Sequence, residues 1–164
     1  MFDEQKSVYP KAMSFPAMVF WTGLFGGIFW GTIGSIAYYF NMTQIRPSVI
    51  LEEWVMGNWK YGWIGTVVSI VIFGILSIGA AFFYYALLRK FPGMWFGIGY
   101  GILLFLIVFF VLNPLFPGIK PIGDLNRDTI ISSICLYTLY GIFIGYSINY
   151  EYQNRIVQEN EAAS

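Results

Sequence analysis

The sequence contains no histidine, one cysteine and few charged residues. Without histidine, the chain lacks the commonest metal ligand and the usual general base near neutral pH. The single cysteine, Cys135, has no partner for a disulfide within the chain. Nine basic residues balance nine acidic ones, so the chain has no basic excess for binding nucleic acid. Motifs for a nucleophile–base pair, a phosphate loop or a zinc site are also missing. We therefore expect no enzymatic activity, no metal and no cofactor.

Apolar residues are what the sequence has in abundance. Hydrophobic residues make up 57% of the chain, aromatic residues 21% and charged residues only 11%, where soluble domains have about a quarter charged. Four apolar runs without Asp, Glu, Lys or Arg are long enough to cross a bilayer, at about 1.5 Å per residue against a core of roughly 30 Å. They cover about residues 15–40, 63–88, 94–112 and 129–150. We therefore expect an all-α integral membrane protein with four transmembrane helices in an antiparallel bundle.

The polar segments complete this topology. We expect tails over residues 1–14 and 151–164 and a long first outer loop over residues 41–62. A short helix near residues 48–56 would lie at the membrane surface, anchored by Trp54 and Trp59. An irregular loop with the same aromatic anchors is the alternative.

The two residues that directly follow the second span are basic. Arg89 and Lys90 are expected to interact with the negative end of the helix dipole and to reach the membrane surface. The tight Phe91-Pro92-Gly93 connection predicts that the third span runs antiparallel beside the second. This basic pair in the shortest loop places both termini in the cytoplasm by the positive-inside rule.

Small residues recur every fourth position in three of the spans. Residues four apart lie on one face of a helix, and a face without side chains lets another helix approach until the backbones touch. The predicted helix-packing residues are Gly23, Gly27, Gly31, Ser35, Gly93, Gly97, Gly101, Gly141 and Gly145. The first three glycines precede Gly93, Gly97 and Gly101 by 70 positions. This spacing indicates either a repeat of two helical hairpins or a coincidence of a common residue.

Charge is absent where membrane transporters usually need it. Proton-coupled transporters keep ionisable groups inside the membrane, and none of the four spans contains one. Tyrosines such as Tyr84, Tyr100 and Tyr140 either present hydroxyls to a cavity or pack the bundle. Outside the membrane, four carboxylates on one predicted face could hold a divalent cation, or could lie in solvated or salt-bridged loops. They belong to Glu52, Glu53, Asp124 and Asp128.

Several stretches together resemble one protein family. They are Phe25-Gly26-Gly27, Tyr38-Tyr39-Phe40, Ile45-Arg46-Pro47, Asn113-Pro114 and the segments 86–91 and 141–152. The chain resembles the YqhR family of membrane proteins of Bacillus-type bacteria over nearly its whole length. This resemblance implies a multi-span protein of the bacterial cytoplasmic membrane and brings no catalytic residues with it.

Glycine-rich faces on three spans predict association between helices. We expect a non-enzymatic structural or interaction protein that associates with itself or with another membrane protein in the bilayer. A channel or transporter for a small neutral or lipid-like solute is the alternative, and it requires a polar cavity between the helices.

Overall fold

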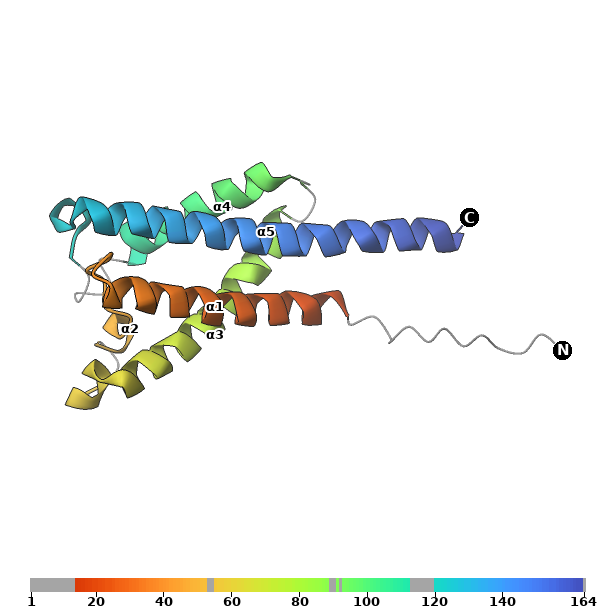
Figure 1. Cartoon of the computed structure of the whole chain (residues 1–164). Coiled ribbons are helices and arrows are strands. Elements are labelled where there is room, and N and C mark those ends of the chain that lie inside the picture. Colours follow the sequence, from red (N-terminus) through yellow and green to blue (C-terminus); the bar gives the residue numbers. More distant parts are fainter. Residues whose placement is uncertain (1–13, 53–54, 89–90, 92, 113–119, 164) are drawn as a thin grey trace.

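Figure 1 shows the chain as a computed structural model. The structure describes residues 14–52, 55–88, 91, 93–112 and 120–163. All regular elements in these residues are helices, and four helical segments are long and apolar enough to cross a membrane. The predicted fold class, an all-α protein with four spans, is confirmed.

The four long helical segments lie close to the predicted spans. The first is α1 (Phe15–Tyr39) and the second is α3 (Trp63–Leu88). The third consists of α4 (Met94–Leu106), which continues into the π-helix η2 (Ile107–Leu112). The fourth, α5 (Arg127–Ala163), is a single helix of 37 residues. It continues beyond the predicted end of the span at residue 150, and in this extension Glu151 and Arg155, spaced four apart as a short helical extension requires, form an ion pair at 3.0 Å.

Short elements occupy the connections. The connection between α1 and α3 contains α2 (Val49–Glu52) and the 3-10 helix η1 (Asn58–Tyr61). The connection between the third and fourth spans contains the 3-10 helix η4 (Ile122–Asp124). Of the helix expected near residues 48–56, the described part is the four residues of α2, and residues 53–54 lie outside the described residues. Gly57, at a φ of 129° that L side chains rarely adopt, separates α2 from η1.

Local sequence explains where α1 begins and ends. Pro16 occupies the first turn, where its missing N–H costs no helical hydrogen bond. Asn41 has a φ of 58°, a left-handed conformation that asparagine tolerates better than most residues, and it turns the chain after the helix. The end of the bundle that holds Asn41 is called the distal end, and the end where α1 begins is called the proximal end.

The helices pack as two pairs joined through a third contact. The closest pairings are α1 with α3 and α4 with α5, and α1 also packs along α5. Figure 1 shows α1 and α5 nearly antiparallel, with α3 running diagonally across α1. The expectation that α3 and α4 pair side by side is wrong for the described residues. Because α3 is tilted to follow its contact with α1, it meets α4 mainly around Tyr100, whose ring lies 5.0 Å from that of Tyr84.

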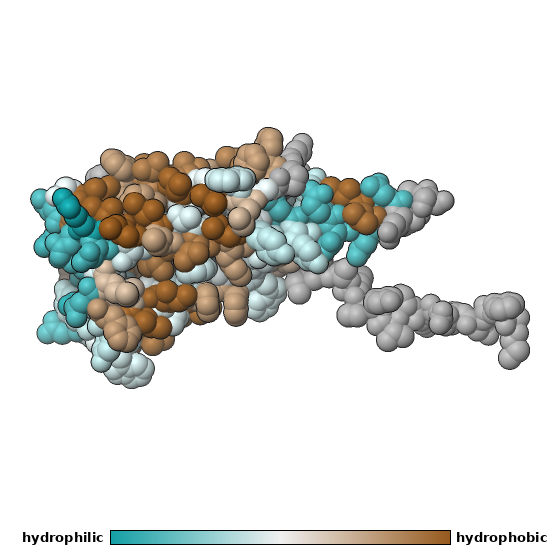
Figure 2. Space-filling model, turned by 45° about the horizontal axis from the view of Figure 1, so that its top comes forward, coloured by the Kyte–Doolittle hydropathy of each residue, from teal (hydrophilic) through white to brown (hydrophobic). Residues whose placement is uncertain are grey.

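The interior of the bundle is built from aromatic, branched and small side chains. One buried cluster joins all four spans and includes Val19, Ala81, Tyr84, Tyr100 and Ile144. A second cluster, with Phe105, Phe109 and Leu125, lies toward the distal end. Figure 2 shows hydrophobic side chains over the middle of the molecule and hydrophilic ones at both ends, as a bilayer requires.

Candidate functional site

The glycines of α1 form a close crossing with α3. A Cβ atom added at Gly27 would lie 2.5 Å from Ser77 Cβ and 2.7 Å from Gly74 Cα. At Gly23 it would lie 2.8 Å from Ile78 Cα. Real Cβ atoms do not approach other atoms so closely, so the two backbones can meet here only because both positions are glycine.

A second crossing joins α4 and α5. A Cβ atom at Gly97 would lie 3.0 Å from the carbonyl oxygen of Gly141, and one at Gly145 would lie 2.9 Å from Gly97 Cα. At Gly101 a Cβ atom would collide with the carbonyl oxygen of Tyr137. Glycines on both helices therefore set this distance of approach.

Three other predicted packing residues lie in looser surroundings. A Cβ atom at Gly31 would make ordinary contact, 3.4 Å from Phe73 Cδ2. Ser35 donates its hydroxyl hydrogen to the carbonyl oxygen of Gly31 in its own helix, at 2.8 Å. Gly93 is exposed, and a Cβ atom there would meet only Phe96 of the following turn among the described residues.

The two crossings are made by residues at corresponding positions of the two helix pairs. Gly27 contacts Phe73, Gly74 and Ser77, and Gly97, 70 positions later, contacts Gly141, Ile142 and Gly145. The three partners of Gly97 each follow the partners of Gly27 by 68 positions. A repeat of two helical hairpins with the same orientation predicts such a match. Among the described residues the match ends at Gly93, where a Cβ atom would make no contact like those at Gly23.

Three glycines in the spans remain uncovered, and the spacing pattern did not single them out. Among the described residues, and apart from the backbone of the same helix, no atom lies within 4 Å of a Cβ position at Gly34, Gly79 or Gly99. Gly79 on α3 and Gly99 on α4 are both exposed, and they lie at similar depth because the Tyr100 hydroxyl donates to the carbonyl oxygen of Ala80 at 2.5 Å. Burial, which one sequence does not reveal, separates these glycines from those in the crossings.

Buried polar side chains connect the helices by hydrogen bonds. The Ser77 hydroxyl donates to the carbonyl oxygen of Gly23 at 2.6 Å, and its oxygen lies 2.5 Å from the Tyr140 hydroxyl. Asn149 donates from Nδ2 to the Tyr84 hydroxyl at 2.9 Å and to the carbonyl oxygen of Phe91 at 3.2 Å. Sequence reasoning missed Asn149, although a polar amide inside an apolar run signals such a role.

The predicted interfacial anchors are only partly described. Trp54, Arg89 and Lys90 lie outside the described residues. Trp59 lies in η1 at the distal end and is 43% exposed. The aromatic contact of Trp59 with the membrane surface stays a prediction.

Basic side chains brace the first distal loop. Arg46 donates from Nε to the Tyr38 hydroxyl at 3.1 Å, and its guanidinium lies 5.2 Å from the centre of the Tyr61 ring. The hydrogen bond with Tyr38 raises the pKa of Arg46 above its already high ordinary value, so this charge is permanent. Lys60 donates to the carbonyl oxygens of Glu52 and Val55, at 3.3 and 3.1 Å.

The carboxylates considered as a cation site do not gather. Among the described residues, no group of three or more His, Cys, Asp or Glu side chains could hold a metal ion. This result covers Glu52, Asp124 and Asp128, while Glu53 lies outside the described part. Divalent metals that prefer oxygen need several such ligands around one point.

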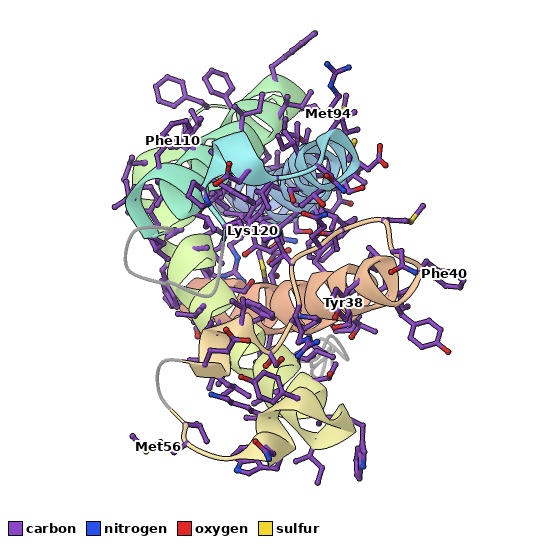
Figure 3. All side chains as sticks on the ribbon, turned by 90° about the vertical axis from the view of Figure 1, so that its left-hand side faces the viewer. Tyr38, Phe40, Met56, Met94, Phe110 and Lys120 are labelled. Atoms are coloured by element: carbon purple, nitrogen blue, oxygen red, sulfur yellow. The ribbon has the colours of Figure 1, made fainter. Side chains whose placement is uncertain are left out.

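A polar cavity lies at the distal end between the two loops that cover it. Its volume is about 470 Å³, and its lining includes Tyr38, Asn41, Gln44, Lys120 and Asn126. Figure 3 looks onto this end and shows Lys120 between the start of α5 and the α1 ribbon that carries Tyr38. The loops hold their positions through the Gln44 N–H, which donates to Thr129 Oγ1 at 2.9 Å.

At the opposite end, α5 projects past the other helices (Figure 1). Its projecting part begins near Glu151, and the first residues of this part contact the start of α1. The Phe15 ring lies 6.0 Å from that of Tyr152 and 5.2 Å from the Arg155 guanidinium. The Tyr85 ring, on α3, lies 5.0 Å from the ring of Phe15.

Four long apolar helical segments held by glycine crossings, with polar side chains at both ends, define an integral membrane protein with several spans. The chain belongs to the YqhR family, since residues 2–163 match the family described as "Conserved membrane protein YqhR". This match confirms the resemblance inferred from the sequence.

One relative supports the same assignment. The chain is 50% identical over 131 residues to the "Uncharacterized protein YqhR" of Bacillus subtilis (strain 168). The similar region covers 80% of this chain and 74% of that protein. No solved structure is significantly similar to the chain.

Proposed function

We propose that the protein is a non-enzymatic membrane protein that acts by association with a helix of a second copy or of another membrane protein. The observation that carries this proposal is the pair of uncovered glycines, Gly79 and Gly99. They lie at similar depth on the outward faces of two helices, and each leaves a notch in a surface of large apolar side chains. Such notches let another helix approach closely in lipid.

This association differs from the one expected from glycine spacing alone. The glycines at positions 23, 27, 97, 101, 141 and 145 already contact helices of the same chain. A leucine at Gly27 would therefore damage the bundle itself rather than a contact with a partner. The notches on α3 and α4 are where close helix contact is still available.

The transport alternative has less support. The buried hydroxyls of Tyr84, Tyr100 and Tyr140 each form a hydrogen bond with another part of the bundle. Hydroxyls used in this way hold helices together instead of offering a path to a solute.

The location proposed for this role is the bacterial cytoplasmic membrane, with both termini in the cytoplasm. The relative from Bacillus subtilis supports a bacterial membrane. The basic pair Arg89-Lys90 supports the orientation through the positive-inside rule. In this orientation the projecting end of α5 lies in the cytoplasm.

The test compares the double variant Gly79→Leu/Gly99→Leu with Gly34→Leu. All three positions have open space around them, so both variants should fold, but Gly34 lies on α1. The proteins are cross-linked in native membranes, purified, and analysed by native gel and mass spectrometry. We expect a dimer or a reproducible membrane partner with the natural sequence and with Gly34→Leu, and its loss with the double variant. A monomer without partners in every case, or an undiminished complex in the double variant, would contradict the proposal.

A further inference from the structure

The distal cavity lies at the depth of lipid headgroups. Its walls come from the end of α1, the loop that follows it and the segment just before α5. The exposed aromatic residues Tyr39 and Phe40 stand beside it, and aromatic residues in such positions mark the boundary between hydrocarbon and headgroups. Figure 3 shows Phe40 pointing outward from this end.

The lining of the cavity favours a negatively charged group. Lys120 supplies an ammonium group, and Asn41, Gln44 and Asn126 supply amide groups that can donate hydrogen bonds. Arg46 is not part of the described lining, but it brings a second cation near the cavity, since its Nε lies 3.1 Å from the hydroxyl of the lining residue Tyr38. Opposite charge and convergent donors are the features that bind phosphate oxygens.

The backbone at the start of α5 also favours a negatively charged group in the cavity. Asn126 precedes the first residue of α5, so the positive end of the dipole of this long helix is directed at the cavity. Asp124 and Asp128 are exposed in the same stretch, but neither lines the cavity. No carboxylate is therefore part of its described lining.

From these features we propose that the distal cavity binds a phosphate-bearing headgroup, such as that of an anionic glycerophospholipid. Lys120 and Arg46 neutralise the phosphate, and the amides of Asn41 and Asn126 bond to its oxygens and to the glycerol hydroxyls. A volume of about 470 Å³ is in the usual range for small-ligand sites, roughly 300–1,000 Å³. The acyl chains extend along the apolar sides of α1 and α5.

The experiment measures binding to the full chain in neutral detergent by native mass spectrometry and isothermal titration. The probes are dihexanoyl phosphatidylglycerol, the soluble glycerol 3-phosphate, and dihexanoylglycerol, which has the same chains without phosphate. The variants are Lys120→Gln, Lys120→Arg and the matched control Arg127→Gln. Arg127→Gln removes one exposed charge from the same end, at a residue that does not line the cavity.

We expect phosphatidylglycerol to bind and dihexanoylglycerol not to bind. Lys120→Gln should weaken the binding by about tenfold, as the loss of one charge-assisted hydrogen bond does. Lys120→Arg and Arg127→Gln should each stay within about twofold of the natural protein. Binding of phosphatidylglycerol alone identifies a lipid headgroup, and equal binding of glycerol 3-phosphate identifies a soluble phosphate ester as the source. Equal effects of Lys120→Gln and Arg127→Gln, or equal binding of dihexanoylglycerol, would overturn the proposal.

Discussion

Some glycines of this chain are required by close helix contacts, and others have open space around them. At Gly27 the backbone of α3 occupies the place of a side chain, whereas at Gly34 that place is open. Both residues lie in the same helix, but only Gly27 belongs to the four-residue spacing of small residues. The position of the second helix determines which glycine the fold requires and which one it tolerates.

Gly27→Leu should destabilise the protein. The added side chain collides with Ser77, Gly74 and the carbonyl oxygen of Phe73, and the crossing must open to accommodate it. Overpacking of this kind costs about 1–3 kcal/mol in the free energy of unfolding. Gly34→Leu is the control and should change it by less than about 0.5 kcal/mol. Unfolding in mixed micelles followed by circular dichroism provides both values, and equal losses would contradict this explanation.

Ser77 and Tyr140 should be energetically coupled. Their hydroxyl oxygens lie 2.5 Å apart, and Ser77 also donates to the carbonyl oxygen of Gly23. A double-mutant cycle with Ser77→Ala and Tyr140→Phe should give a coupling energy of about 0.6 kcal/mol, with about 1.7 kcal/mol as the upper limit seen in membranes. The same cycle with Ser77→Ala and the exposed Tyr146→Phe should give none. Additive effects of the first pair would show that this hydrogen bond does not contribute.

Individual helices follow from the sequence more completely than their partners do. Apolar runs and flanking polar residues located all four spans, because lipid requires a continuous helix of fixed minimum length. The pairing of α3 with α4 was predicted wrongly, since a short connection limits distance but not tilt. The glycine contact with α1 determines the tilt, and its register depends on both helices.

The length of α5 also exceeded expectation. The apolar run ends at residue 150 because most of the following residues are polar, yet the helix continues to Ala163. Its first turn beyond the span is held by Phe15, which lies between Tyr85 and Tyr152. Contacts with α1 and α3 therefore support a polar helix that would be marginal alone in water.

Phe15→Ala should loosen this projecting segment. Without the ring, Tyr152 and Arg155 lose their contact with α1. Amide hydrogen exchange over residues 151–158 should become roughly fivefold faster, the equivalent of one lost aromatic pair. Phe25→Ala provides the control, because Phe25 is 63% exposed and stacks on Phe29 of its own helix. If both variants exchange alike, the projecting helix is not held by Phe15.

In the whole bundle, two glycine crossings at corresponding positions hold two hairpins, α1 with α3 and α4 with α5. The two hairpins contact each other mainly where α1 packs against α5. The arrangement is not symmetric, because α3 and α4 do not form the counterpart of the contact between α1 and α5. The outward faces of α3 and α4 retain uncovered glycines, and the proposed association with another helix takes place there. The distal cavity lies at the other contact, between the end of α1 and the start of α5.

Composition was sufficient to predict a membrane bundle, since few charges and long apolar runs fit no other class. The cavity could not be predicted, because it is formed by residues 38–45 and 120–126, which are distant in sequence. Its position depends on how two loops fold over the helix ends, and no local pattern encodes that. The hydrogen bond from the Gln44 N–H to Thr129 Oγ1 is an example of such a long-range link.

The most direct test of the glycine-lined bundle is disulfide cross-linking in native membranes, in a Cys135→Ser background. Gly31→Cys is paired with Phe73→Cys, since a Cβ atom at Gly31 would lie 3.5 Å from Phe73 Cβ and has room for the substitution. We predict rapid disulfide formation on mild oxidation, because a disulfide needs Cβ atoms about 3.5–4.5 Å apart. Gly34→Cys with Phe73→Cys should remain reduced, because no atom of another described helix lies within 4 Å of a Cβ position at Gly34. Equal cross-linking of both pairs, or of neither, would contradict the crossing of α1 and α3.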